Sequence, residues 1–231
     1  MLFRSQPLRI HAVNIFALGG GQATGRVTNN SILETNQGSG VRVVAEVTTS
    51  GNPTVIIDIS DNTLADIVGD TVLAGIHLEA RDGVGGATGT ANIQATVNNN
   101  DVNVNNAGAH LEIYNSDSNT VCGNFTNNTT SGTAFFGDDF YIGNPVSGTG
   151  LGPGTVIMQG WTGNLQTTWT NNGNTGTTFN EGTSPIAGTC TTVSAPVPIM
   201  VKEAKTTATG FVPMAATGPL ATEKQIGRAH V

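Results

Sequence analysis

The amino-acid sequence predicts an all-β protein organised as a parallel β-helix, a solenoid in which successive coils stack strand upon strand. Three observations support this fold class: a short motif recurs along the chain, its apolar residues alternate with polar ones, and equivalent residues fall at equivalent positions in successive units. The alternative is an antiparallel β-sandwich, in which turns recur about every 8–12 residues. We prefer the solenoid because its coils stack like residues on like, which a sandwich does not require.

The recurring motif has an apolar residue, a polar residue, and then Asn or Asp followed by Asn. It occurs four times, as RVTNNSI (26–32), DISDNTL (58–64), TVNNNDV (96–102) and NFTNNTT (124–130). Asn accepts the left-handed backbone conformation, and its side-chain amide can bond the backbone. We therefore expect a sharp turn at each motif, with the second Asn of each turn stacked in a ladder from coil to coil. These residues are Asn30, Asn62, Asn100 and Asn128, at steps of 32, 38 and 28 residues.

Around each turn the apolar residues alternate with period two, which indicates strands with one buried face. Before the turns, the matching inward residues are Val55, Ile57 and Ile59, then Ile93, Ala95 and Val97, then Val121 and Phe125. A second strip follows each turn, as GVRV (40–43), GIHL (75–78), GAHL (108–111) and DFYI (139–142). No sustained 3.6-residue pattern occurs in the repeat region, so we expect no helix there.

Aligning the second strips places their outward residues in columns along the solenoid. One column would hold Arg42, His77, His110 and Tyr141, and the next Val44, Glu79 and Glu112. Strands of neighbouring coils lie about 4.8 Å apart, so Glu79 and Glu112 are candidate catalytic carboxylates at the roughly 5 Å separation of a retaining glycosidase. His77 and His110 could likewise act in catalysis or share a metal. We prefer a solvated outer face without a metal site, because the sequence places no third ligand.

The composition argues against several functional classes. Charged residues make up 11% of the chain and the formal net charge is −7, whereas an average protein has about 25% charged residues. The lack of a Lys/Arg cluster argues against a nucleic-acid partner, and no apolar run approaches the roughly 20 residues of a membrane span. We expect no cofactor, with calcium as the alternative, because neither EF-hand spacing nor a nonapeptide calcium repeat is present. The acidic residues considered for calcium are Asp58, Asp61, Asp66 and Asp70.

Two cysteines and two tryptophans stand outside the repeated motif. Cys122 falls on the outward side of its strip, and Cys190 ends the last repeat-like segment. A disulfide between them would pin the last coil in an oxidising compartment, but two free thiols are also compatible with the sequence, which does not fix their distance. Trp161 and Trp169 are candidate ligand-binding residues, as are Arg42 and Tyr141. We favour a role for the tryptophans in plugging the end of the coil, which would otherwise expose its core.

The stretches VTNNSI, ISDNTL, VNNNDV and FTNNTT, each leading to a GIHLEA-like strand, resemble right-handed parallel β-helix repeats. They are more closely similar to the long β-strand-repeat surface proteins of bacteria, and the resemblance covers residues 10–192. It implies a right-handed β-helix with a secreted or cell-surface, adhesin-like role. Pectate-lyase-like enzymes share this fold, but the basic cluster that neutralises an acidic sugar is missing here, and only Arg42 and Arg81 stand near the candidate site.

Both ends of the chain look foreign to the repeat. Reverse translation of residues 1–5 and of residues 226–231 matches the complementary strands of a common sequencing adapter, so we expect residues 1–5 and 225–231 to be non-native. Residues 6–192 would then form the β-helix fragment. Residues 193–224, rich in Pro, Thr and Ala, would form a linker, because Pro-rich stretches are extended spacers. The signal and anchor of a longer protein would lie outside this fragment.

Two functional hypotheses follow. The preferred one is a non-catalytic structural or adhesive segment of a large secreted or cell-surface protein, whose repetitive polar face binds glycans or other host or cell-surface components. The alternative is a pectate-lyase-like polysaccharide lyase or glycoside hydrolase that uses Glu79, Glu112, His77 and His110. Fold class does not decide between them, but an enzyme would need converging carboxylates with perturbed pKa values.

Overall fold

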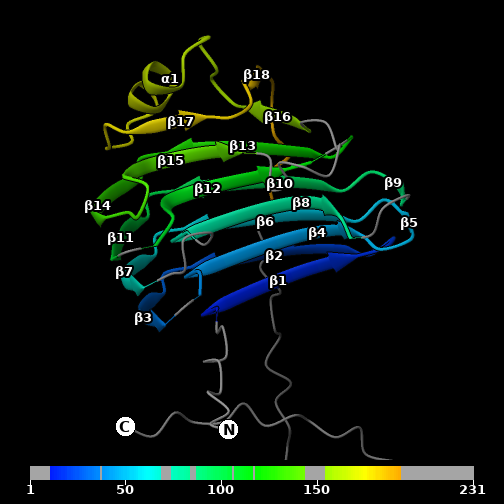
Figure 1. Ribbon diagram of the computed structural model, residues 1–231, viewed down its shortest axis with the longest axis horizontal. Helices are drawn as coiled ribbons and strands as arrows, with labels where there is room; N and C mark the ends of the chain where they lie inside the picture. Colours follow the sequence, from blue (N-terminus) through cyan, green and yellow to red (C-terminus); the bar gives the residue numbers. More distant parts are fainter. Residues whose placement is uncertain are drawn as a thin grey trace, which may run out of the picture. The chain divides into compact units, whose positions relative to one another are not determined.

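The computed structural model describes residues 11–36, 38–68, 74–83, 87–105, 107–116, 118–143 and 154–193 of the 231-residue chain. These residues form a parallel β-solenoid of about five turns (Figure 1). All of their strand pairs are parallel, and one short helix, α1 (Leu165–Asn171), follows the last full turn. The predicted parallel β-helix is confirmed and the antiparallel sandwich is wrong. The expected non-native ends and residues 194–224 of the expected linker lie outside the described residues.

Each turn of the solenoid adds one strand to each of two or three sheets, stacked in chain order. Sheet 1 contains β1 (Val13–Leu18), β4 (Val41–Val47), β8 (Ile76–Asp82), β12 (Ala109–Asn115), β15 (Asp138–Gly143) and β17 (Phe179–Glu181). Sheet 2 contains β2 (Gln22–Thr28), β6 (Thr54–Ser60), β10 (Asn92–Asn98), β13 (Thr120–Thr126), β16 (Thr155–Met158) and β18 (Ile186–Ala187). Sheet 3 contains β3 (Ser31–Asn36), β7 (Thr63–Val68), β11 (Asp101–Asn105) and β14 (Thr129–Thr133), and β5 (Ser50–Gly51) pairs with β9 (Thr88–Gly89).

The core lies inside the solenoid, between the sheets, and the residues predicted to face inward fill it. On sheet 2, Ile93 pairs with Val55 on one side and Val121 on the other, so like side chains stack on like. On sheet 1, Ile76 lies between Val41 and Leu111. Burying an aliphatic side chain of this size stabilises a fold by about 1.5–3 kcal/mol, so these stacks are a principal source of the stability of the fold.

Each motif forms the predicted turn, and its two polar residues have different structural roles. The first residue adopts the left-handed conformation, with φ between 53° and 58° at Asn29, Asp61, Asn99 and Asn127. This conformation is costly for most residues but accessible to Asn and Asp. The second residue, always Asn, turns its side chain into the stack. The Asn-rich sequence thus supplies a backbone corner at one position and a hydrogen-bonding group at the next.

The second Asn of each turn forms a continuous side-chain ladder. In Asn62, the backbone N and Nδ2 both donate to Oδ1 of Asn100, at 3.1 and 2.9 Å, and Nδ2 also donates to the Val27 carbonyl at 2.7 Å. The same pair of bonds joins Asn30 to Asn62 and Asn100 to Asn128. A fifth rung, which the sequence pattern did not predict, continues from Asn128 to Asn174. The ladder satisfies buried amides that would otherwise destabilise the corner.

Helix α1 lies at the C-terminal end of the stack (Figure 1). Its Trp169 is fully buried and stacks on Phe140 of the last coil, with ring centroids 4.8 Å apart. The indole Nε1 donates to the Thr175 carbonyl at 2.7 Å. Trp169 therefore closes the core, as the plug interpretation expects, and it offers no exposed ring for stacking on a sugar. Trp161 is partly buried and packs against the same core.

Candidate functional site

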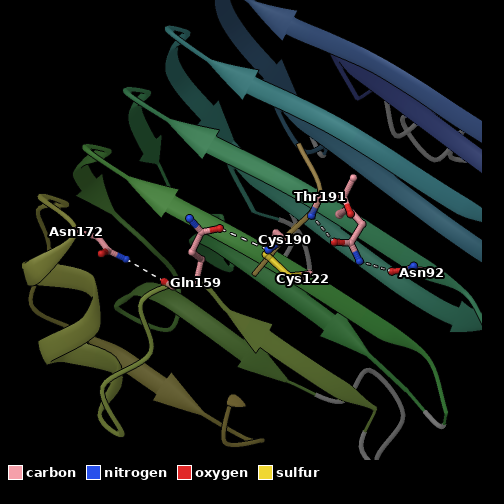
Figure 2. Close-up of a disulfide and its surroundings, with 7 residues drawn as sticks. Asn92, Cys122, Gln159, Asn172, Cys190 and Thr191 are labelled. Atoms are coloured by element: carbon pink, nitrogen blue, oxygen red, sulfur yellow. Dashed lines mark hydrogen bonds between the residues drawn. A yellow bond between two sulfur atoms is a disulfide. The ribbon is translucent and has the colours of Figure 1, made fainter. Parts of the chain in front are cut away.

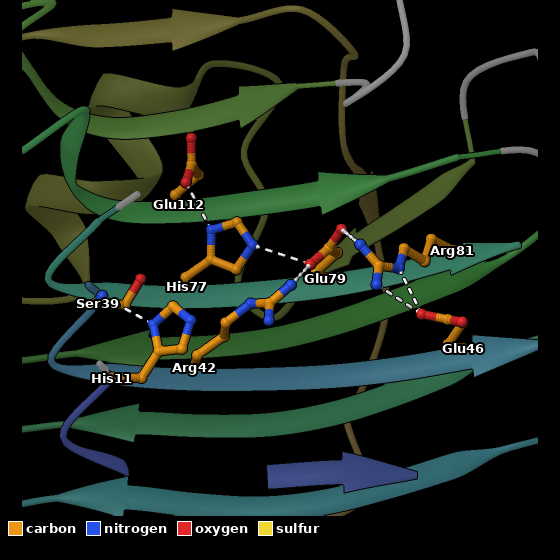
Figure 3. Close-up of polar contacts among 8 residues, drawn as sticks. All are labelled: His11, Ser39, Arg42, Glu46, His77, Glu79, Arg81 and Glu112. Carbon is orange, nitrogen blue, oxygen red and sulfur yellow. Dashed lines mark hydrogen bonds and ion pairs between the residues drawn. The ribbon is translucent and has the colours of Figure 1, made fainter. Parts of the chain in front are cut away.

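A compact group of ionisable side chains lies on the outer face of sheet 1. It comes from three adjacent strands, β4, β8 and β12, and we call it the charge cluster (Figure 3). Its members are Arg42, Glu46, His77, Glu79, Arg81 and Glu112. His77, Glu79 and Glu112 are 2%, 5% and 4% exposed, so the expectation of a solvated outer face is wrong at this point.

The cluster is a chain of short charged contacts centred on Glu79. Arg42 Nη2 donates to Glu79 Oε2 at 2.6 Å, and Arg81 Nη1 donates to Glu79 Oε1 at 2.7 Å. Arg81 also donates through Nε to Glu46 at 2.7 Å. His77 links the two central carboxylates, with Nδ1 2.6 Å from Glu112 Oε2 and Nε2 3.4 Å from Glu79 Oε2. Every carboxylate of the cluster thus has a cationic or imidazole partner.

The predicted columns are wrong by two residues at β12. Glu112 pairs with His77 and Tyr114 with Glu79, so neither the two glutamates nor the two histidines share a column. Arg42 does pair with His77, and Glu112 with Tyr141. The Gly residues misled the alignment at β12, because Gly40 and Gly75 directly precede their paired residues, whereas Gly108 lies three residues before Leu111. Counted from the turn Asn, Val41 and Leu111 both lie at position 11 (41 − 30 and 111 − 100), whereas Ile76 lies at position 14 (76 − 62).

His110 belongs to a different environment from His77. It is 3% exposed, its Nε2 lies 2.6 Å from the Ser131 carbonyl, and its Nδ1 lies 3.4 Å from Asp139 Oδ1. The predicted sharing of a metal between His77 and His110 is therefore not supported by their placement. Within the described residues, no group of three or more His, Cys, Asp or Glu side chains is arranged to hold a metal ion.

The acidic residues considered for calcium have protein partners where they are described. Asp58 lies 3.5 Å from Arg26 Nε and accepts a hydrogen bond from Ser60. Asp61 accepts one from Asn99 Nδ2 at 2.7 Å. The side chains of Asp66 and Asp70 lie outside the described part of the chain.

The electrostatics of the cluster favour its charged form. Burial alone would lower the pKa of His77, but its contacts with Glu112 and Glu79 outweigh this and raise the pKa to about 9. Burial would raise the pKa of Glu79, but His77, Arg81 and Arg42 lower it to about 2. With His77 protonated, three cations face three carboxylates. Such an arrangement links three coils and leaves neither Glu79 nor Glu112 free as a base or nucleophile at neutral pH.

Aromatic rings border the cluster. Tyr114 contacts His77 edge to face at 5.2 Å and Tyr141 at 5.8 Å. Burial and the neighbouring Glu112 carboxylate raise the pKa of both tyrosines. On the other side, the Arg42 guanidinium lies over Phe16, 5.4 Å from its ring centroid. Arg42 and Tyr141, two candidate ligand-binding residues, are thus both engaged in contacts around the cluster.

We predict that the free energy of unfolding falls by about 3 kcal/mol as the pH rises from 6.5 to beyond 9. The folded state holds the His77 proton more tightly than the unfolded chain, whose pKa is 6.5, so the stabilisation is complete below pH 6.5 and is lost as the pH rises through about 9. One pKa unit corresponds to about 1.4 kcal/mol. Urea unfolding across this range measures the effect.

His77→Gln is the control for this pH dependence, because glutamine keeps a hydrogen-bond donor but does not titrate. An equally steep fall in His77→Gln would assign the pH dependence to other groups. The opposite behaviour applies to Glu79, whose contribution is complete above pH 4.5 and is lost as the pH falls toward 2. The cluster therefore stabilises the fold fully only between about pH 4.5 and 6.5.

Cys122 and Cys190 form a disulfide, with their Cα atoms 5.4 Å apart (Figure 2). Cys122 lies on the outer side of β13, and Cys190 lies in residues 188–193, which follow the last strand and which we call the C-terminal strap. The strap is also held by Gln159 Oε1, which accepts from the Cys190 amide at 3.4 Å, and by Gln94 Oε1, which accepts from the Thr191 amide at 2.9 Å. It therefore crosses the outer face of sheet 2 rather than joining it as a strand.

A groove that the sequence did not suggest lies beside β14, at the level of the last coil. Its volume is about 430 Å³, and residues 130–134, residues 176–178, His110 and Asp139 form most of its lining. The sequence signal that could have pointed here is the adjacent pair Phe135-Phe136, which stands in a corner between two strands.

Comparison with protein-family models, curated proteins and solved structures gave no match to this chain. Among the described residues, no helix has both the length and the apolar character needed to cross a membrane.

Proposed function

We propose that this chain is a non-catalytic structural and adhesive segment of a secreted or cell-surface protein, in which the solenoid presents its polar outer faces to glycans or other cell-surface components. The observation that carries the proposal is the state of the charge cluster. Glu79 and Glu112, the carboxylates that a glycosidase or lyase on this fold would use, are buried and paired with His77, Arg42 and Arg81. Their charges hold coils together.

Two further observations support the proposal. The Cys122–Cys190 disulfide is of the kind that persists in oxidising compartments, as in secreted and surface proteins. The Asn ladder and the stacked core make the stability of each coil depend on its neighbours, as in other solenoid repeat proteins. These features suit a segment that must keep its shape outside the cell.

The competing hypothesis is a polysaccharide lyase or glycoside hydrolase. A general base must come within hydrogen-bond reach of the proton that it removes, and a nucleophile must reach the sugar carbon. Glu79 would have to give up contacts with Arg42 and Arg81 to do either. A binding face does not require the loss of these contacts, because it can bind a ligand without a change in the charge cluster.

We predict that the purified chain releases no product from polygalacturonate, xylan or β-glucan. The measurements are reducing ends for hydrolysis and absorbance of unsaturated uronates for lysis. Glu79→Gln and Glu112→Gln serve as matched samples, with Asp101→Asn as a control, because Asp101 is exposed and lies outside the cluster. Product that forms with the wild type and with Asp101→Asn, but not with folded Glu79→Gln or Glu112→Gln, would replace this proposal with the enzyme hypothesis.

A further inference from the structure

A second hollow lies beside the groove at β14, and residues 164–166 at the start of α1 contribute to its lining. The second hollow has a volume of about 350 Å³ and is lined by Asn164, Gln166, Phe179 and Glu181 among others. Thr177 lines both hollows. We call these two adjoining hollows the terminal groove. Two adjoining hollows can take neighbouring units of a linear ligand.

Phe135 and Phe136 are next to the terminal groove along the chain, between Ala134 and Gly137, which both line it. The two rings are 52% and 59% exposed and contact each other edge to face at 5.0 Å. Their turn has a defined backbone, in which the Phe136 amide donates to the Gly108 carbonyl at 3.3 Å and the Gly137 amide to the Ala134 carbonyl at 3.0 Å. The rings therefore present apolar area to solvent from a fixed support.

The core does not explain these aromatic residues. In the preceding coil this corner carries Ala107 and Gly108, whose carbonyls accept from the Phe135 and Phe136 amides. Small residues are sufficient to make the corner. Two exposed phenylalanines at this corner gain no stability from burial, and exposed apolar side chains of this kind indicate contact with a ligand.

The lining of the terminal groove specifies an uncharged, hydroxyl-rich ligand. No Lys or Arg contributes to either hollow, so an acidic polymer would meet no counter-charge. The carboxylates are already used: Asp139 accepts from the Thr177 and Thr178 amides, and Glu181 accepts from the Leu165 amide. The hydroxyls of Thr133 and Thr177 take no partner within the described chain and remain free to bond a ligand.

We propose that the terminal groove binds a neutral polysaccharide chain, with Phe135 and Phe136 stacking against sugar rings and the threonine hydroxyls bonding sugar hydroxyls. Aromatic faces pack against the apolar faces of pyranose rings, and polar groups placed beside them fix the orientation. This inference rests on the proposed non-catalytic binding function and gives it a site and a ligand class.

The test is native affinity electrophoresis of the full chain in gels that contain a β-glucan, a galactomannan, an arabinoxylan or dextran, with polygalacturonate as the acidic comparison. We expect at least one neutral polysaccharide to retard the wild type. Phe135→Ala/Phe136→Ala should weaken that binding by about tenfold or more. Both rings are largely exposed, so the double variant should keep the circular dichroism and melting temperature of the wild type.

Leu33→Ala is the matched control, because Leu33 is 63% exposed on β3, in the first coil. It should bind as the wild type does. No retardation by any neutral polysaccharide, retardation by polygalacturonate alone, or unchanged binding in the double variant would each overturn the inference. A dimer in sedimentation velocity that the double variant abolishes would show a protein interface instead. None of these outcomes produces the sugar fragments that would overturn the non-catalytic function, so the two failures are distinguishable.

Discussion

Asn100→Ala is expected to lower the free energy of unfolding by about 4 kcal/mol. Oδ1 of Asn100 accepts from both the backbone N and Nδ2 of Asn62, and its Nδ2 donates to the Ile59 carbonyl at 2.8 Å. Truncation removes a hydrogen bond from each of these buried groups, although Asn62 Nδ2 keeps its bond to the Val27 carbonyl. A buried group left unpaired costs about 1–3 kcal/mol. Urea unfolding followed by fluorescence and circular dichroism measures the loss, because the buried Trp169 reports on the far end of the same stack.

Asn30→Ala is the matched control for this prediction. Asn30 forms the first rung of the ladder and is exposed. Within the described residues, no rung precedes it, so its side chain accepts no ladder bond. Its truncation mainly removes one hydrogen bond from Asn62 Oδ1. We expect a cost below about 1 kcal/mol, as for an exposed hydrogen bond. Equal costs at the two positions would mean that the ladder adds nothing beyond a turn preference at each corner.

The turns could be predicted from the sequence because their physics is local. Asn and Asp accept positive φ at little cost, and the pattern that places them recurs at Asn29, Asp61, Asn99 and Asn127. The corners alone do not give the strand register, because Val41 lies 11 residues beyond its turn Asn and Ile76 lies 14 residues beyond its own. The Gly alignment failed at β12, because the distance from the Gly to the paired residue is not constant.

The charge cluster could not be predicted, because it depends on contacts between residues about one coil apart in sequence. Alternation correctly places His77 and Glu79 on the outer face of β8, and it says nothing about what covers that face. Val44, also outward, is fully buried there. Glu112 lies beside His77 because Gly108 is two residues farther from the paired residue of its strand than Gly75 is. The contacts of His77 with Glu112 and Glu79 raise its pKa against the opposing effect of burial, and no local sequence pattern contains these contacts.

The sequence indicated that tryptophans close the C-terminal end of the solenoid, but not the helix or the extra ladder rung that complete this cap. An open solenoid end exposes its core, so two tryptophans just beyond the last repeat indicate a plug. The helix that carries Trp169 begins at an Asn cap, where Asn164 Oδ1 accepts from the Thr167 amide at 2.9 Å. Asn174 then adds a rung to the ladder from outside any repeated motif. Both features depend on how the chain returns over the last coil.

Removal of the disulfide is the second large effect that we expect. Cys122→Ala/Cys190→Ala should lower the free energy of unfolding by about 4 kcal/mol, because the bond closes a loop of 68 residues and so restricts the unfolded chain. For a domain of this size, that loss corresponds to a fall in melting temperature of roughly 10 °C. Calorimetry of the variant beside the oxidised wild type measures it.

The structure also predicts where the variant loosens first. Beyond β18, the C-terminal strap has no strand partner, and two glutamine side chains hold its amides at residues 190 and 191. Without the Cys122 bond these contacts are too weak to retain an extended segment against its conformational entropy. The amide of Thr191 should then exchange with solvent far faster, while the amides of β10 and β13 stay protected. Gln94→Ala, which keeps the disulfide, should leave the strap in place. Unchanged protection at Thr191 in the cysteine variant would mean that the strap is held by its packing on sheet 2 and not by the covalent bond.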